Sequence, residues 1–179
     1  MTISPQLWEN APVPASVRIL GIDPGLSRCG YAVIDYDGRR PTSVEYGLIR
    51  TNPETPTPVR LHDIVGELRR IVRELKPAEC AVERVYFFRN VSTAIDVAMI
   101  MGATLVMAIE EGLVTRQYAP LQVKRAIVGT GRADKNQVQR MVAALYGLHD
   151  VPKPPDVADA LAVALTHAHM RNAPQSAVG

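Results

Sequence analysis

The sequence is poor in the residues that mark several common protein classes. Two cysteines among 179 residues cannot build the disulfide framework of a small secreted domain. Cys29 and Cys80 lie in apolar, strand-like runs, so we expect small core side chains in a reducing cytoplasm. The longest apolar stretch, residues 97–109, is too short for a convincing membrane span. The first 16 residues contain no Lys or Arg, so we expect neither a signal nor a transit peptide.

Net charge is also small, at +2, and alone it identifies no partner. The length of 179 residues, with 47% hydrophobic and 21% charged residues, suits one ordinary globular domain. We predict a flexible N-terminal extension over residues 1–16, a single domain over residues 17–171 and a disordered tail over residues 172–179. The absence of targeting and membrane signals favours a cytoplasmic protein.

Hydrophobic periodicity and turn residues predict five strands and five helices. Asp37-Gly38 marks a hairpin turn between the second and third strands. Thr57, followed by Pro58, is predicted to cap the first helix, and Asp134 with Gln137 to cap the fourth. The predicted strands are residues 17–23, 29–36, 43–51, 79–85 and 113–118, and the predicted helices are residues 57–76, 90–111, 121–128, 134–146 and 156–170.

A hairpin meander followed by alternating helices and strands favours an α/β fold, with a five-stranded mixed sheet and helices on both faces. One of these helices is apolar nearly all round, because Asp96 is the only charged residue between 91 and 109. Such a helix is buried on every side, which a chain of this size struggles to achieve alone. We therefore expect one face to pack against a second copy in a homodimer; the alternative is a central helix covered by its own domain.

Four carboxylates stand where apolar runs end or begin. Asp23 and Glu83 end two predicted strands, and Asp156 and Asp159 open the last helix on one face. Acids beside a core are costly unless they are paired or bind a cation, and carboxylate oxygens are the ligands that Mg²⁺ and Mn²⁺ prefer. Two such ions about 4 Å apart promote phosphodiester hydrolysis. For Asp156 alone, a helix-capping role remains open.

Basic and aromatic residues gather in two other segments. Six basic residues and a single acid lie between residues 116 and 140, which suits a polyanion but also fits a solvated helix face. Lys124, Lys135 and Arg132 are the phosphate-contact candidates in this segment. Directly after Glu83, an aromatic run ends in a basic residue; it can stack on unpaired bases, or its rings can be core, and which ring reaches DNA stays open. The run comprises Tyr86, Phe87, Phe88 and Arg89.

The ordered set of these motifs resembles the RuvC-type Holliday junction resolvases over about residues 19–169. The matching stretches are residues 20–25 (Leu-Gly-Ile-Asp-Pro-Gly), 30–34 (Gly-Tyr-Ala-Val-Ile), 81–85 (Ala-Val-Glu-Arg-Val), 122–124 (Gln-Val-Lys), 135–138 (Lys-Asn-Gln-Val) and 156–162 (Asp-Val-Ala-Asp-Ala-Leu-Ala). The resemblance implies an RNase H-like fold and a dimeric, Mg²⁺-dependent endonuclease. Such an enzyme nicks two strands of like polarity in a four-way DNA junction, leaving 5′-phosphate and 3′-hydroxyl ends.

The resemblance also assigns roles to residues. The four family acids, which hold two Mg²⁺ or in substitution Mn²⁺, correspond to Asp23, Glu83, Asp156 and Asp159. Tyr86 corresponds to the aromatic residue that the family places at the crossover. The implied partners are junction DNA, a second copy of the chain and the RuvA–RuvB branch-migration complex. Three alternatives are a nuclease acting on RNA or on RNA–DNA hybrids, a scaffold that binds junctions without cutting, and an actin-like ATPase; no second phosphate-binding loop supports the last.

Overall fold

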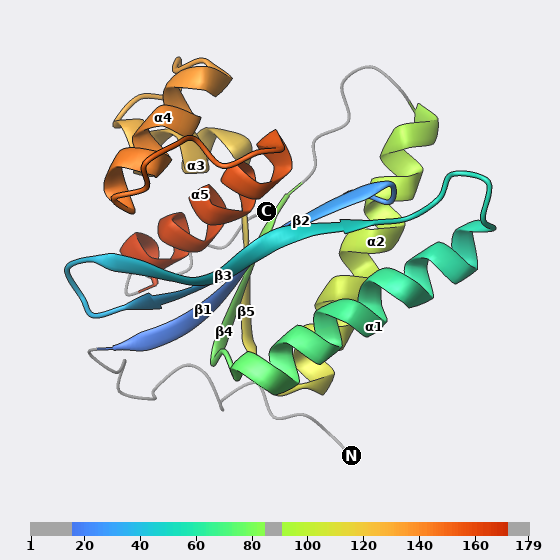
Figure 1. Cartoon of the computed structure of the whole chain (residues 1–179). Helices are drawn as coiled ribbons and strands as arrows, with labels where there is room; N and C mark the ends of the chain where they lie inside the picture. Colours follow the sequence, from blue (N-terminus) through green and yellow to red (C-terminus); the bar gives the residue numbers. More distant parts are fainter. Residues whose placement is uncertain (1–15, 85–90, 172–179) are drawn as a thin grey trace, which may run out of the picture.

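The computed structural model describes residues 16–84 and 91–171, with the backbone alone for residues 91–93. Three predicted segments lie outside the described residues: residues 1–15 of the extension, the aromatic run at 86–89 and the tail at 172–179. The predicted five-stranded mixed sheet is confirmed, with strand order β3-β2-β1-β4-β5 (Figure 1). Its strands are β1 (Val17–Asp23), β2 (Arg28–Tyr36), β3 (Pro41–Arg50), β4 (Glu79–Glu83) and β5 (Val114–Tyr118).

Strand directions in the sheet are mixed. β1, β2 and β3 form an antiparallel meander, whereas β1, β4 and β5 run parallel. The predicted turn after β2 is confirmed, because Gly38 has a φ of 88° and Asp37 Oδ1 accepts hydrogen bonds from Arg39 N and Arg40 N at 2.8 and 2.7 Å. Because parallel strands end at the same edge of a sheet, the last residues of β1 and β4 are neighbours.

Helices cover both faces of the sheet, as predicted. Figure 1 shows α3, α4 and α5 on one face and α1 and α2 on the other. Strand side chains alternate between the two cores: Ile19 and Ala81 pack with the first group of helices, and Leu20 and Val82 with the second. Cys29 and Cys80 are buried free thiols in the second core, as expected. The helices are α1 (Thr57–Leu75), α2 (Val91–Glu110), α3 (Pro120–Val128), α4 (Lys135–Leu145) and α5 (Pro155–Met170).

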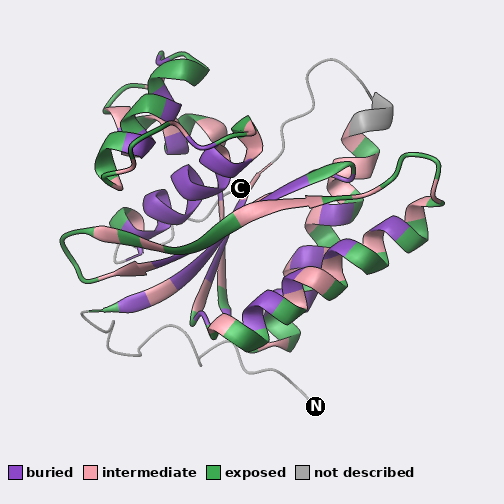
Figure 2. Ribbon diagram, viewed as in Figure 1, coloured by how far each residue is buried: buried purple, intermediate pink, exposed green. Residues whose placement is uncertain are grey.

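Two glycines let α5 lie flush on the sheet. A Cβ on Gly21 of β1 would stand 2.4 Å from the Ala160 carbonyl oxygen, and a Cβ on Gly30 of β2 would stand 2.1 Å from the Asp156 carbonyl oxygen. Neither position can therefore carry a side chain without moving the helix. As a result, α5 is the most continuously buried helix in Figure 2.

Several helix and strand boundaries differ from the predictions. The N-cap of α1 is Pro56, so Thr57 is the first helical residue rather than the cap. The predicted capping box of α4 is confirmed, because Asp134 Oδ1 accepts from Gln137 N at 2.8 Å and Asp134 N donates to Gln137 Oε1 at 3.0 Å. β4 ends at Glu83, two residues earlier than predicted.

Among the described residues, no helix has the length and apolar character needed to cross a membrane.

The single chain does not bury α2 on every side, as expected for a chain of this size. Ile100, Met107 and Ala108 pack into the second core, whereas large apolar side chains on another face remain exposed. The exposed positions recur at alternating spacings of four and three residues, which is the spacing of a helix–helix seam. We call this face the α2 stripe; its residues are Ile95, Met99, Gly102, Val106 and Ile109, with 54, 38, 59 and 41% of the surface of Ile95, Met99, Val106 and Ile109 exposed.

Candidate active site

Two strands, β1 and β4, and the helix α5 bring the four predicted acids together at one edge of the sheet. Ile22 of β1 pairs with Val82 of β4, so Asp23 and Glu83 follow on adjacent strands at the same level. α5 begins over this edge because Gly30 leaves room for its first turn. Asp156 and Asp159, one turn apart, therefore face the strand ends, and their side chains are only 17 and 19% exposed.

Burial, together with mutual repulsion, raises the pKa values of three of these acids. Burial, followed by the charges of Glu83, Asp159 and Asp156, raises the pKa of Asp23 well above its usual value. Burial and the charge of Asp159 raise the pKa of Glu83 to about 7. Burial also raises the pKa of Asp159, against the opposing effect of Lys135. This cluster therefore carries more negative charge than its own surroundings neutralise, which is the electrostatic condition for binding cations.

Lys135 supplies part of the missing positive charge. It is the first residue of α4, placed there by the Asp134 cap, and its Nζ lies 2.6 Å from Asp159 Oδ2. Burial alone would lower the pKa of Lys135, but the hydrogen bond and charge of Asp159, with further contributions from Asp23 and Asp156, raise it. One ammonium cannot balance four carboxylates, so the cluster retains capacity for further cations.

Asp156 has a carboxylate oxygen suited to a cation. Its Oδ2 is buried without a hydrogen-bond partner among the described residues, and its Oδ1 lies 3.6 Å from the Arg28 guanidinium. Pro154 is the N-cap of α5, so Asp156 does not have the capping role that the sequence left open. An orphaned carboxylate oxygen and an all-oxygen donor set fit Mg²⁺ or Mn²⁺. As the side chains stand within the described ranges, however, no three His, Cys, Asp or Glu residues are arranged so that they could hold one metal ion together.

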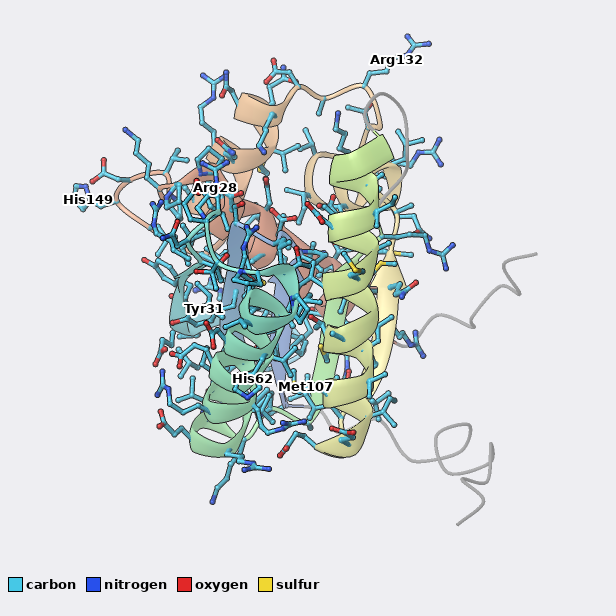
Figure 3. All side chains as sticks on the ribbon, turned by 90° about the vertical axis from the view of Figure 1, so that its right-hand side faces the viewer. Arg28, Tyr31, His62, Met107, Arg132 and His149 are labelled. Carbon is cyan, nitrogen blue, oxygen red and sulfur yellow. The ribbon has the colours of Figure 1, made fainter. Side chains whose placement is uncertain are left out.

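A pocket of about 240 Å³ opens beside the cluster and joins it to the basic segment. Lys124 of α3 and Lys135 of α4 therefore reach the same hollow as two of the acids. The lining residues are Glu83, Pro120, Val123, Lys124, Lys135, Val138, Asp159 and Ala162. Arg132 does not join them: it is exposed in the α3–α4 connection and extends away from the body of the protein (Figure 3). The candidates at 86–89 lie outside the described residues.

The sequence reasoning missed two residues of this site. Arg28 opens β2 directly after the turn that follows β1, and nothing in its local sequence indicates its contact with Asp156, 128 positions away. Gln139 lies one turn after Lys135 on α4, a spacing that could have revealed it. Gln139 also lowers the pKa of Asp159, although its buried Nε2 makes no hydrogen bond of good geometry in the described part of the chain.

These pKa shifts predict how stability depends on pH. Between about 4.5, the ordinary pKa of Glu, and about 7, folded Glu83 retains a proton that the unfolded chain has released. The free energy of unfolding of the metal-free protein should therefore decrease as pH rises through this window, and Asp23 and Asp159 act in the same direction. Mg²⁺ should raise the melting temperature more at pH 8 than at pH 5, because only ionised carboxylates bind it.

Thermal unfolding with and without Mg²⁺ at the two pH values measures this effect. Glu83→Gln serves as the control, because it removes one titrating group. It should weaken the pH dependence of the unfolding free energy and the pH dependence of the Mg²⁺-induced rise in melting temperature. An equal Mg²⁺-induced shift at pH 5 and pH 8 would contradict cation binding at these acids.

Comparison with known proteins decides the family. The family model described as crossover junction endodeoxyribonuclease RuvC matches residues 19–167. The chain belongs to the RuvC family. The RuvC protein of Desulfitobacterium hafniense (strain DSM 10664 / DCB-2) is 48% identical over 154 residues, which is 86% of this chain and 93% of that protein.

Solved RuvC structures match the fold. The Thermus thermophilus RuvC structure has a TM-score of 0.80 and 35% identity, covering 86% of this chain and 95% of that one. A second structure, of the Thermus thermophilus protein in complex with Holliday junction substrate, has a TM-score of 0.79 and 33% identity, covering 86 and 94%. The RNase H-like fold expected from the sequence is thereby confirmed.

Proposed function

We propose that this RuvC-family chain resolves Holliday junctions through a metal-dependent nuclease centre built by Asp23, Glu83, Asp156 and Asp159. The observation that carries the proposal is the convergence of the four acids at one edge of the sheet: Asp23, Glu83 and Asp159 have raised pKa values, and Glu83 and Asp159 line a pocket shared with two lysines. Family membership and the RuvC complex with Holliday junction substrate support the substrate. Residues 17–171 would form the single nuclease domain, acting in the cytoplasm in recombination and DNA repair.

The four acids would hold two Mg²⁺ ions, with Mn²⁺ able to substitute. When bound, such ions supply Lewis-acid activation of water and of the leaving 3′ oxygen. The protein contributes the fixed orientation of the ligands. Asp23 and Glu83 are set by two paired strands, and Asp156 and Asp159 by a helix that is flush with the sheet. Asp156 Oδ2, which accepts no hydrogen bond from any residue that the structure describes, can accept an ion at no cost in those hydrogen bonds.

Basic side chains around the cluster would hold the DNA backbone. Lys124 lines the pocket, and Lys135 is 62% exposed although it contacts Asp159, so both can meet a phosphate entering the pocket. Arg28, 55% exposed beside Asp156, is placed to contact the same strand. Arg132 would reach backbone phosphates farther out. Tyr86, Phe87, Phe88 and Arg89, which follow Glu83 in the sequence, remain predicted contacts at the crossover.

Salt dependence tests the lysine assignments. Lys124→Gln and Lys135→Gln should each weaken junction cutting and reduce the magnitude of the salt slope of binding by about one phosphate contact. Junction binding measured across a salt series gives the slope. Lys76→Gln is the matched control, because Lys76 is exposed and follows α1 at the other end of the sheet. Unchanged slopes for both pocket lysines would contradict phosphate contacts there.

The α2 stripe would pair with its copy in a second chain to form a homodimer. Two centres related by a two-fold axis match a four-way junction of near two-fold symmetry, which accounts for paired nicks in strands of like polarity. The products would carry 5′-phosphate and 3′-hydroxyl ends. The RuvA–RuvB branch-migration complex would be the partner that presents the junction.

Strand mapping on a synthetic four-way junction tests the proposed function. With each strand labelled in turn and Mg²⁺ or Mn²⁺ present, we expect symmetric cuts in two strands of like polarity and products that DNA ligase can seal. Linear duplex and an RNA–DNA hybrid are the controls. Equal cutting of the hybrid and the junction would favour the alternative of a hybrid-acting nuclease, and tight binding without cutting would favour the scaffold.

A further inference from the structure

A buried polar network lies at the end of α5 that is remote from the acids. Glu79, His167 and Arg171 lie at this end, and the hydroxyl of Tyr118 reaches His167 from the last residue of β5, which pairs with Glu83. His167 Nε2 lies 2.6 Å from Glu79 Oε2, and its Nδ1 lies 2.7 Å from the Tyr118 hydroxyl. Arg171 donates to both oxygens of Glu79, with Nε 3.2 Å from Oε2. The side chains of Glu79, His167 and Arg171 are 13, 1 and 6% exposed.

The hydrogen bonds of this network hold Glu79 ionised. Burial alone would raise its pKa, but hydrogen bonds from His167 and Arg171 outweigh burial and lower it to about 2. An ionised carboxylate only accepts, so His167 Nε2 is the donor in its bond to Glu79. Buried charged networks contribute little net stability compared with apolar packing, and their best-attested role is to specify register.

Small residues line the contact between α5 and the two glycines of the sheet. Ala160 and Ala164 lie against Gly21 of β1, although larger side chains of the helix, Leu161 and Leu165, are buried as well. Small side chains form shallow ridges, which interlock less than Leu or Phe would. At this glycine contact the side-chain ridges are shallow, so the polar network at one end of α5 adds a constraint on the axial position of the helix that the glycine contact does not supply.

The geometry of β4 and α5 connects this polar network to the acids. β4 has Glu79 at one end and Glu83 at the other, four residues away, or about 13 Å along a strand. α5 has His167 at one end and Asp159 eight residues earlier, or about 12 Å along a helix. The two spans match. When His167 is level with Glu79, Asp159 is level with Glu83.

We infer that Glu79 and His167, supported by Tyr118 and Arg171, are positioning residues that set the axial place of α5 and thereby align Asp156 and Asp159 with Asp23 and Glu83. The inference rests on the proposed metal centre. A slip by one helical residue moves the helix by about 1.5 Å, and displacements of that size are costly for catalytic groups.

Variants of the network and a neighbouring control test the inference. Glu79→Gln retains the shape of the side chain, and His167→Asn removes the bond to one partner. Both should weaken Mn²⁺ binding, followed by electron paramagnetic resonance, about tenfold or more. They should lower the single-turnover cutting rate to a similar extent while leaving the junction dissociation constant unchanged.

Thr166→Ala is the matched control. Thr166 is buried next to His167 on α5, and its hydroxyl donates to Ala162 O within the same helix at 2.8 Å. The control should lose stability yet bind Mn²⁺ as the wild type does. Arg171→Lys, which retains the charge, replaces His167→Asn if that variant does not fold.

The possible failures are distinguishable. Wild-type protein that binds no Mn²⁺ would overturn the metal centre, and the inference with it. Wild-type protein that binds Mn²⁺, together with network variants that bind it as tightly as Thr166→Ala, would overturn the positioning role alone.

Discussion

Replacing Glu83 by Gln should reduce junction cutting by about 10³-fold or more while leaving junction binding near the wild-type level. The amide has the shape of the carboxylate but no charge, so it is a poor ligand for Mg²⁺. Removing one negative charge from a cluster that repels itself also lowers the pKa values of the remaining acids, so the fold should be retained or stabilised. Single-turnover cutting and separate binding measurements without divalent cations give the two quantities.

Asp23→Asn and Asp159→Asn should behave in the same way, because both carboxylates lie in the same cluster. Glu74→Gln is the matched control: Glu74 is an exposed partner of Arg70 on α1, and its loss should not affect cutting. Near-normal cutting by Glu83→Gln would contradict the assignment of this residue to the centre. A variant that loses junction binding but retains the wild-type single-turnover cutting rate would also contradict this assignment.

Placing a charge on the α2 stripe should separate the dimer and abolish paired cutting. Val106 is 59% exposed in the single chain, and burying a glutamate between two copies of α2 would desolvate an unpaired charge. We expect Val106→Glu to weaken self-association by at least about 10²-fold, because an unpaired interfacial charge costs several kcal/mol. Sedimentation should then give a species near the chain mass of 19.5 kDa, in place of one of twice that mass for the wild type.

Val59→Glu is the control for this result. Val59 is 47% exposed at the start of α1 and is not part of the stripe. Because it makes the same chemical change outside the proposed interface, it should leave both the mass and the paired cuts unchanged. A dimeric Val106→Glu variant, or one that still cuts two strands in concert, would contradict pairing through α2.

The sequence indicated the chemistry of the site because that chemistry interrupts apolar patterns. Asp23 and Glu83 end runs of buried strand residues, and Asp159 lies in a helix that is otherwise Ala-, Leu- and Val-rich. The mixture of antiparallel and parallel strands followed from the meander and the alternating units, since a parallel strand needs a crossover. These features are local, so one sequence suffices to show them.

Features that depend on long-range contact were not predictable in the same way. Arg28 reaches Asp156, and Glu79 reaches His167 across 88 positions, through a fold that periodicity does not specify in detail. The full burial of His167 is visible only in three dimensions. Pro154, rather than Asp156, at the cap of α5 shows how a proline near a helix start changes cap geometry.

Anomalous scattering from Mn²⁺ in crystals of the protein bound to a four-way junction tests the central claim most directly. The account predicts two Mn²⁺ peaks per chain, ligated by Asp23, Glu83, Asp156 and Asp159 and adjacent to a DNA phosphate. It would be contradicted by crystals with ordered DNA in which Mn²⁺ lies away from these four carboxylates.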